Sequence, residues 1–310
     1  MPLLNSMKLQ HNVFSSGYSC YGPWVNDFDL WILDLNYVSE FFPIYRLVKE
    51  YKGLLLLANI NDAINFNIRK GNTIDIIEIV NRANGFIKPY WDYNTLNITC
   101  HKNGQKIPIT KEKRIISNPY YIDIDSFMPK PKNEKNKQVF FKGGNTNPKR
   151  RTICEKLQNE EWYKGGIYGK HFNLGRFSIP DELRIDKLDE QEHLNELNES
   201  LISICPPGHT LLSRRIMEII ALKSVMLCDN LQEYLWLNKL EENKHYLCID
   251  YDNIQEQCLL LINDEEKCDR IRYEAHKIYD NYYVLTKNKC LHPNMYNDIK
   301  KQLALINIFL

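Results

Sequence analysis

The second half of the chain alternates short apolar runs with segments that repeat apolar residues at helical spacing. The apolar runs are bounded by Gly, Pro, Asp or Asn, which is typical of buried strands. These patterns predict strands at 138–144, 164–169, 200–208, 224–230 and 244–251. They predict helices at 148–160, 211–223, 253–264, 264–283 and 293–307, with acidic amphipathic segments over 180–200. Such alternation predicts a parallel sheet with helices on both faces.

The first half is less regular but indicates the same class of structure. Strands are predicted at 12–16, 29–35, 53–60 and 85–91, and helices at 36–51 and 72–83. The Asn103-Gly104 pair within 96–109 is typical of a β-hairpin turn. The first half is therefore expected to be an α/β domain as well.

A segment rich in lysine and proline, residues 127–138, separates the two halves. Because it has no apolar residue after Met128, it predicts a solvated linker or loop. Domains are thus expected at 1–127 and 138–292, followed by a helix within 293–310 that packs back on the first domain. Two α/β domains can face each other across a central cleft with the carboxyl ends of their strands, where ligands bind.

Charge and composition narrow the class of protein. The 310 residues include 40 basic and 39 acidic residues, and the net charge of +1 argues against a nucleic-acid partner. The nine cysteines form no CxxC pair, so we expect reduced core residues and no zinc knuckle. No signal-peptide pattern or run of about 20 apolar residues occurs, so we expect a soluble, cytoplasmic protein without a transmembrane segment.

Charged residues interrupt the apolar helix predicted at 211–223. Leu212, Ile216, Ile219 and Ile220 lie on its wide apolar face. Arg214, Arg215 and Glu218 share the remaining arc, where they can form an ion pair within the helix. Alternatively, because the helix follows a strand and a Pro-Pro-Gly turn, its positive end near Ser213 and Arg215 suits a diphosphate.

A second basic helix start follows the strand at 138–144. Gly143-Gly144 allows close approach of the backbone to a ligand, and Asn147 and Pro148 are expected as N-cap and first helical residue. The next three residues are Lys149, Arg150 and Arg151. Cations are unfavourable at a helix N-terminus, so this cluster is either solvated or holds an anion. Neither a P-loop nor a dinucleotide-binding motif is present.

Together these two stretches resemble the C-terminal nucleotide-sugar domain of GT-B glycosyltransferases. The resemblance is to the exostosin-like and CAP10-like groups and to the group 1 C-terminal domain, and it covers about 115–290. It lies in Pro207-Gly208, then Ser213-x-Arg215-x-x-Glu218, then the turn at Lys223-Ser224 before an apolar strand. The chain departs from the family where "LKS" replaces the usual glycine before that strand. The implied fold is two Rossmann-like domains with parallel sheets facing a cleft.

The resemblance implies a role for each matching residue. A nucleotide-diphosphate sugar would be the donor substrate, and no other cofactor would be required. The second domain would bind this donor, and the first would bind the acceptor. Arg215 would neutralise the diphosphate, Ser213 would hydrogen-bond it, and Glu218 would bind the ribose. Arg150 or Arg151, together with Lys142, would bind phosphate from the other strand edge. The nucleobase would lie at Tyr168–Lys170. The implied donor-binding residues are Lys142, Gly143, Arg150, Arg151, Tyr168, Lys170, Gly208, Ser213, Arg215 and Glu218.

An inverting transferase needs a base that accepts the proton of the acceptor hydroxyl. We expect the base in the first domain, at Asp29 or at Asp27; His11, Asp34 and Asp92 are further candidates. Asp-x-Asp triplets, which hold Mn²⁺ or Mg²⁺ in GT-A enzymes, occur at 27–29, 123–125 and 250–252. Since these triplets are little above chance, no metal is expected.

The leading hypothesis is therefore an inverting, metal-independent glycosyltransferase that moves a sugar from a UDP- or GDP-linked donor to a hydroxyl of an oligosaccharide or glycoconjugate. A non-catalytic module that binds a nucleotide sugar or a glycan is one alternative. A metal-dependent GT-A transferase and a nucleic-acid binder that uses its lysine-rich stretches are the others.

Overall fold

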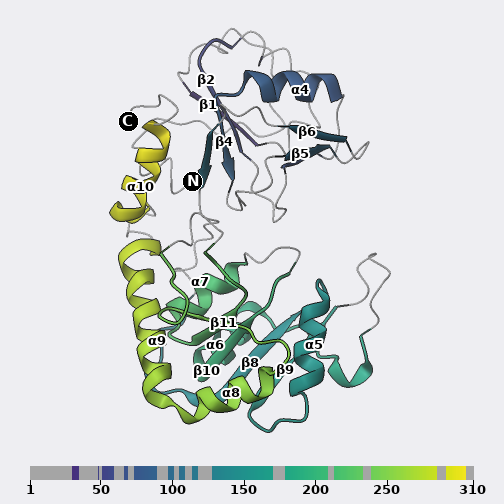
Figure 1. The fold of residues 1–310 in the computed structure, drawn as a ribbon, viewed down its shortest axis with the longest axis vertical. Coiled ribbons are helices and arrows are strands. Elements are labelled where there is room, and N and C mark those ends of the chain that lie inside the picture. The colour runs from purple at the N-terminus through teal and green to yellow at the C-terminus, as the bar shows by residue number, and fades with distance from the viewer. Residues whose placement is uncertain are drawn as a thin grey trace. The chain divides into compact units, whose positions relative to one another are not determined.

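The structure is a computed structural model, and it divides the chain into two compact units (Figure 1). Unit 1 holds residues 1–121, 234–236 and 286–310, and unit 2 holds 122–233 and 237–285. The residues that the structure describes are 30–34, 48, 51–58, 66–68, 73–88, 97–100, 105–108, 114–117, 128–169, 179–208, 213–232, 239–284 and 291–304.

Unit 2 is built on a five-stranded sheet in which every pair of neighbouring strands is parallel. The strands are β8 (Asn136–Gly144), β9 (Tyr163–Tyr168), β10 (Ser200–Cys205), β11 (Val225–Cys228) and β12 (Leu247–Cys248). Their order across the sheet is β12-β11-β10-β8-β9. This confirms the parallel sheet that the strand-helix alternation predicts.

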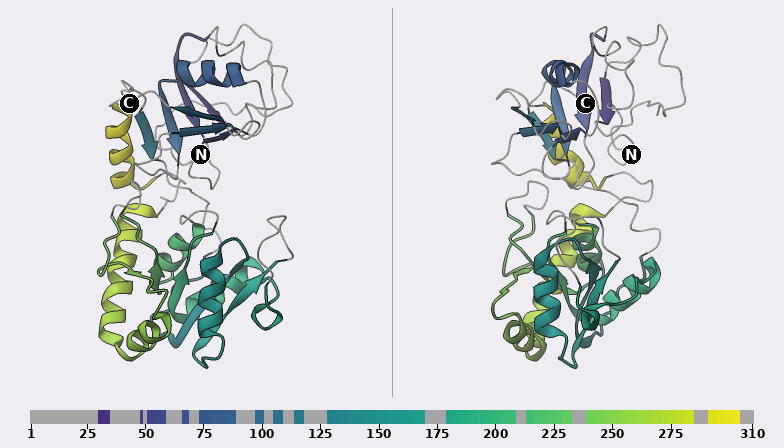
Figure 2. Two further views of the ribbon diagram at one scale, coloured as in Figure 1. Left: turned by 45° about the vertical axis from the view of Figure 1, so that its right-hand side comes forward. Right: turned by 90° about the vertical axis from the view of Figure 1, so that its right-hand side faces the viewer.

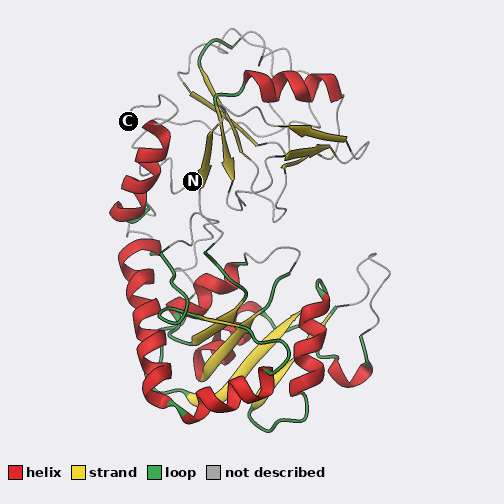
Figure 3. Ribbon diagram, in the orientation of Figure 1, coloured by secondary structure: helices red, strands yellow, loops and turns green. Residues whose placement is uncertain are grey.

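Helices cover both faces of this sheet, as Figures 2 and 3 show. One face carries α5 (Pro148–Leu157) and α8 (Ile254–Asn263). The other carries α6 (Glu190–Glu199) and α7 (Arg214–Ala221). The helix α9 (Glu265–Ile278) packs against α7, α8 and β11. A parallel sheet buried on both faces explains why the fully buried strands β10 and β11 are apolar runs rather than alternating ones.

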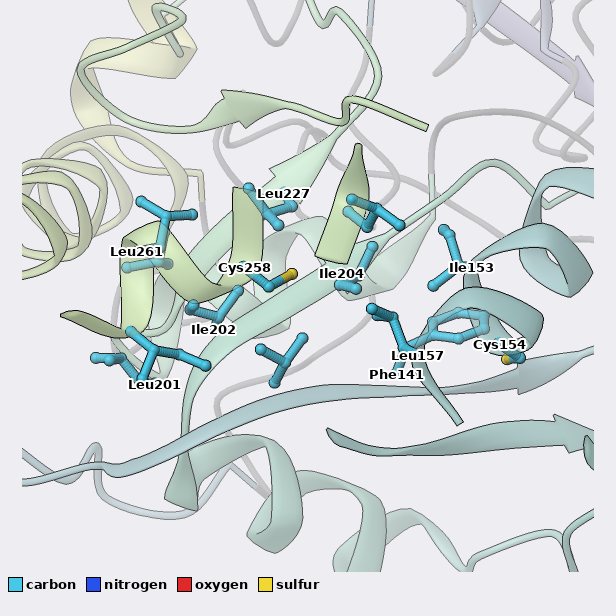
Figure 4. Close-up of a cluster of buried hydrophobic side chains, with 14 of the residues drawn as sticks. Phe141, Ile153, Cys154, Leu157, Leu201, Ile202, Ile204, Leu227, Cys258 and Leu261 are labelled. Atoms are coloured by element: carbon cyan, nitrogen blue, oxygen red, sulfur yellow. The ribbon is translucent and has the colours of Figure 1, made fainter. Parts of the chain in front are cut away.

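The core of unit 2 lies between the sheet and the helices α5, α8 and α9 (Figure 4). Phe141 of β8, Leu157 of α5 and Cys258 of α8 are all fully buried there. The six described cysteines of unit 2 are free thiols, and all but Cys248 are buried. Burial raises the pKa of the Cys154 thiol to about 11. These cysteines therefore act as small apolar core residues, as the sequence predicts.

The segment before β8 is a loop that hydrogen bonds attach to unit 2. The Lys135 Nζ donates to the carbonyl oxygens of Asn198 and Leu222, each at 2.6 Å. Both carbonyls lie at helix C-termini, where a cation is favourable. Arg272 of α9 also donates to the carbonyl of Asn133 over 2.8 Å. Most of residues 128–137 are exposed and 128–135 form neither helix nor strand, as the sequence predicts for a solvated loop, while Lys135 and Asn133 attach this loop to unit 2.

Unit 1 contains a second parallel sheet and a β-hairpin. The sheet has the order β1-β2-β4-β7, with β1 (Leu30–Asp34), β2 (Leu54–Ala58), β4 (Gly85–Lys88) and β7 (Arg114–Ser117). The strands β5 (Asn97–Cys100) and β6 (Gln105–Pro108) pair antiparallel, which confirms the hairpin, while the predicted turn at Asn103-Gly104 lies outside the described residues. The short β3 (Phe66–Ile68) pairs parallel with β5.

Two helices complete the described part of unit 1. The helix α4 (Thr73–Arg82) precedes β4, and Arg82 Nη2 donates to the carbonyls of Tyr51 and Gly53 at 2.8 Å each. The helix α10 (Pro293–Ala304) belongs to this unit and contacts β7. The predicted strand at 12–16 and nearly all of the predicted helix at 36–51 lie outside the described residues. Among the helices described, none combines the length and the hydropathy needed to cross a bilayer.

Candidate functional site

Two glycine-containing segments lie side by side at the carboxyl edge of the unit 2 sheet, and we call them the glycine turns: Gly143-Gly144 and Pro207-Gly208. The strand β8 ends in Gly143-Gly144, and its parallel neighbour β10 is followed by Pro207-Gly208. Asn147 connects the two turns, because its Nδ2 donates to the Gly208 carbonyl over 3.2 Å. Parallel strands end at the same edge, so both turns border the place where α/β proteins bind ligands.

The helix α5 starts as the sequence predicts. The side chain of Asn147 accepts a hydrogen bond from the Lys149 amide over 3.0 Å, and Pro148 is the first helical residue. The three cations that follow then point to three different surroundings. Lys149 binds Asp229 just after β11 (2.6 Å), Arg150 is buried, and Arg151 pairs with Glu155 one turn along the exposed helix surface (2.6 Å).

Arg150 reaches both glycine turns. Its Nε donates to the Pro207 carbonyl over 2.9 Å and its Nη1 to the Gly144 carbonyl over 2.9 Å. The guanidinium carbon lies 5.9 Å from the centre of the Phe141 ring. Only 9% of the residue is exposed.

Arg215 approaches the same ring from α7. Its guanidinium carbon lies 5.5 Å from the centre of the Phe141 ring, and its Nη2 donates to the Lys142 carbonyl over 2.6 Å. Ser213 is the N-cap residue of α7, and its Oγ lies 3.5 Å from the thiol of Cys205. Arg215 is partly exposed. Among the described residues, its contacts use one of the five N–H groups of its guanidinium.

Two guanidinium groups therefore converge on one aromatic ring at the sheet edge. Burial, and next the charge of Arg215, lower the pKa of Arg150 to about 10. Because the two cations repel each other, an anion bound at Arg215 would stabilise both. This arrangement, at the N-terminal end of α7, can hold a phosphate or diphosphate.

The other charged residues of α7 point toward α6. The buried carboxylate of Glu218 accepts a hydrogen bond from Arg214 Nε, and Arg214 also pairs with Glu190. The second oxygen of Glu218 lies 3.7 Å from Nε2 of His193. Burial by itself raises the pKa of Glu218, but the contacts of His193 and Arg214 outweigh it and lower the pKa. The ion pair within the helix is thus real, and it coexists with the separate placement of Arg215.

Lys142 is held on the same side of the sheet as α6. Its Nζ lies 2.7 Å from Glu196, and Lys164 of β9 binds the other oxygen of that carboxylate over 3.0 Å. His193 also packs on Phe140 with ring centres 5.3 Å apart. Sequence reasoning missed His193 and Glu196, although they share one face of an amphipathic helix with Glu190 and could have been found from that spacing.

The remaining predicted donor residues lie along β9. Tyr168 pairs in register with Gly144, and a Cβ at Gly144 would lie 3.6 Å from the Tyr168 ring. Gly169 follows with a φ of 110°, a backbone conformation that favours glycine. Lys170 lies outside the described residues. The structure thus brings Gly143, Arg150, Gly208 and Arg215 together, while Lys142, Arg151 and Glu218 contact other partners.

The candidate catalytic bases cannot be placed. Asp29, Asp27, His11 and Asp92 lie outside the described residues, and so does the triplet at 123–125. Asp34 ends β1, with only its backbone described.

The triplet at 250–252 has a local structural role. Asp250 accepts hydrogen bonds from the amides of Asp252 and Asn253, each at 3.1 Å, just before α8. Within the described ranges, no group of three or more potential metal ligands occurs.

No protein-family model matches the chain, and no curated protein sequence matches it. Several solved structures, however, are similar to this chain in fold. The crystal structure of TarM has a TM-score of 0.49 at 14% identity, covering 90% of this chain and 55% of that chain. This chain thus spans about half the length of TarM. The pneumococcal O-GlcNAc transferase GtfA, in complex with UDP and GlcNAc, has a TM-score of 0.45 at 11% identity, covering 86% of this chain and 54% of that chain.

Sucrose-phosphate synthase from Thermosynechococcus elongatus has a TM-score of 0.50 at 9% identity. The matched region covers 91% of this chain and 73% of the synthase chain. At such low identity the similarity shows the fold alone. It confirms the predicted α/β fold of GT-B type, with Rossmann-like units built on parallel sheets.

Proposed function

We propose that the protein is a glycosyltransferase that uses a nucleotide-diphosphate sugar, with UDP or GDP as the nucleotide. Unit 2 binds this donor at the carboxyl edge of its sheet. Unit 1 binds the acceptor, a hydroxyl-bearing oligosaccharide or glycoconjugate. The transfer inverts the anomeric centre and needs no metal ion.

One observation carries this proposal: Arg215 and Arg150 converge on Phe141 between two glycine turns at the start of α7. The sheet edge beside two adjacent carboxyl ends is where α/β folds bind nucleotides. A guanidinium with unused N–H groups beside a helix N-terminus is matched to a diphosphate in charge and geometry. The GT-B-type fold supports the same assignment.

The mechanism follows from the charge that develops during transfer. Breaking the bond between sugar and phosphate leaves negative charge on the departing diphosphate. Arg215 and the amide groups at the start of α7 are fixed before the reaction, so they stabilise this charge without reorganisation. Asp29 or Asp27 of unit 1 accepts the proton of the attacking hydroxyl.

Glu218 is proposed as the acceptor of hydrogen bonds from the ribose hydroxyls. Its side chain is only 4% exposed, Arg214 donates to one oxygen, and the other oxygen lies 3.7 Å from His193, so a ribose hydroxyl would have to replace the His193 contact. The lowered pKa of Glu218 keeps the carboxylate ionised and able to accept such bonds at neutral pH.

The competing function is a module that binds a nucleotide sugar without transferring it. Both functions need Arg215, and only the transferase needs a base. Thermal stabilisation by UDP- and GDP-sugars therefore tests donor binding. Release of UDP or GDP with an oligosaccharide acceptor tests transfer, with and without EDTA.

Each outcome of this screen decides between the functions. Transfer that persists in EDTA supports the proposal as stated. Stabilisation without any release of UDP or GDP supports the binding module, and transfer that EDTA abolishes would support a metal-dependent enzyme. If no nucleotide sugar stabilises the protein, donor binding is refuted.

A further inference from the structure

The guanidinium of Arg150 occupies a narrow slot between the two glycine turns. A Cβ at Gly208 would lie 2.9 Å from its Nη2, and a Cβ at Gly143 would lie 3.2 Å from its Nη1 and 2.9 Å from the Phe141 ring. Neither glycine has a positive φ. A larger residue at Gly208 would therefore meet Arg150, and one at Gly143 would meet the Phe141 ring first and then Arg150. Side-chain proximity, rather than an unusual backbone conformation, thus favours glycine at both positions.

The hydrogen bonds of Arg150 use this slot to connect two strands. Nε and Nη1 donate at the same time to Pro207, which follows β10, and to Gly144, which ends β8. The neighbouring Lys149 binds Asp229 after β11. The first turn of α5 is thus attached to the carboxyl ends of three adjacent strands.

A buried cation that bonds only backbone carbonyls differs from a typical phosphate ligand. Arg215 is partly exposed, whereas Arg150 is 9% exposed and both of its described bonds are to backbone carbonyl oxygens. A planar guanidinium can bridge two carbonyls in a fixed geometry, and a lysine ammonium on a flexible chain cannot do so equally well.

We propose that Arg150 is a positioning residue that holds the two glycine turns of the donor site at a fixed separation, while Arg215 makes the direct phosphate contact. This inference rests on the proposed donor-binding function for its ligand. The clamp itself is a property of the ligand-free protein. Tyr168 packs beside Gly144, so the clamp also supports the predicted nucleobase side of the site.

The first test uses hydrogen–deuterium exchange of the ligand-free protein. Arg150→Lys and Arg150→Met are expected to speed exchange at least tenfold at the amides of 143–147 and of Cys205 and Gly208, while the rest of the β8–β11 core keeps its protection. Gly208→Ala should give the same result because it displaces the guanidinium while Arg150 remains. Arg270→Met, which removes an exposed arginine on α9, is the matched control and should change neither segment.

The second test compares a ligand with phosphates to one without. In calorimetric titrations, Arg150→Lys should weaken the binding of UDP and the binding of uridine by similar factors of about tenfold, because both ligands need the two glycine turns at their fixed separation. Arg215→Lys should weaken the binding of UDP and leave the affinity for uridine unchanged. If GDP is the better ligand in the screen, GDP and guanosine replace this pair.

Two results would overturn the clamp. One is unchanged exchange at both turns in Arg150→Lys and in Gly208→Ala. The other is an Arg150 variant that weakens UDP but binds uridine as the wild type does, which would make Arg150 a direct phosphate ligand. Failure of the wild type to bind any nucleotide refutes the proposed function, and the exchange data then still decide whether the clamp exists.

Discussion

Replacing Arg215 by alanine is the most direct test of the donor site. The substitution removes the partly exposed guanidinium that lies 5.5 Å from the Phe141 ring at the start of α7. One of its N–H groups bonds the Lys142 carbonyl, so others are available to a diphosphate. A hydrogen bond between charged groups contributes about 1.5–3 kcal/mol. Loss of a bidentate contact should therefore cost about 3 kcal/mol, which is roughly a 100-fold loss of affinity.

The effect of Arg215→Ala on stability should be much smaller. The variant loses the bond to Lys142 over 2.6 Å, which contributes about 1 kcal/mol. It also relieves the repulsion that lowers the pKa of Arg150, and this gain offsets part of the loss. We therefore expect a change in the free energy of unfolding of no more than about 1 kcal/mol.

Calorimetric titration with UDP and GDP measures the affinity, and urea unfolding measures the stability. Turnover of the nucleotide sugar found in the screen should fall below detection. Arg270→Ala on α9 serves as the control for removing an arginine. The reasoning fails if Arg215→Ala binds nucleotide and turns over donor as the wild type does. A loss of affinity that accompanies general unfolding would also contradict the small stability change expected here.

Three further predictions concern stability. Burial alone raises the pKa of Glu196, but the contacts with Lys142 and Lys164 outweigh burial and lower the pKa. The ionised carboxylate therefore stabilises the fold above the pKa that Glu196 has in the unfolded chain. This contribution is lost as the pH falls through the lower pKa of the folded protein. Urea unfolding of Glu196→Gln should therefore show a weaker loss of stability than the wild type below about pH 4.3, and an identical pH profile would contradict the pairing. Phe141→Ala removes a fully buried ring and should cost about 3–5 kcal/mol in urea unfolding, whereas a cost under 1 kcal/mol would show that the ring is not part of the core. Lys135→Met leaves two carbonyls without their ammonium donor and should cost about 1–3 kcal/mol, a loss that a freely solvated segment would not show.

The sequence predicts the fold of unit 2 well because the strands β8, β10 and β11 contain apolar runs with turn residues directly after them. It also predicts the start of α5, since an Asn-Pro pair determines the N-cap and the first turn locally. The strands β3 and β7 were missed because their short sequences, "FNI" and "RIIS", carry too little pattern. The hairpin between β5 and β6 was found because an Asn-Gly turn is a strong local signal.

The candidate site is less predictable because its geometry depends on contacts between distant segments. Successive residues of a helix point about 100° apart. The sequence therefore shows that Lys149, Arg150 and Arg151 diverge, without showing which one is buried. Only the packing of α5 on the sheet selects Arg150. Likewise, the pairing of Lys142 with Glu196 depends on where α6 lies, which no local motif encodes.

Two of the bonds that assemble the donor edge span long stretches of chain: Arg150 and Pro207 are 57 positions apart, and Arg215 and Lys142 are 73 positions apart. Such non-local contacts form late in folding, because closing long loops costs entropy before any contact repays it. A nucleotide that binds there would therefore meet a competent surface only after β8 and β10 have paired. It would slow the unfolding of the finished protein without speeding its refolding, so substrate would protect the enzyme only after folding is complete.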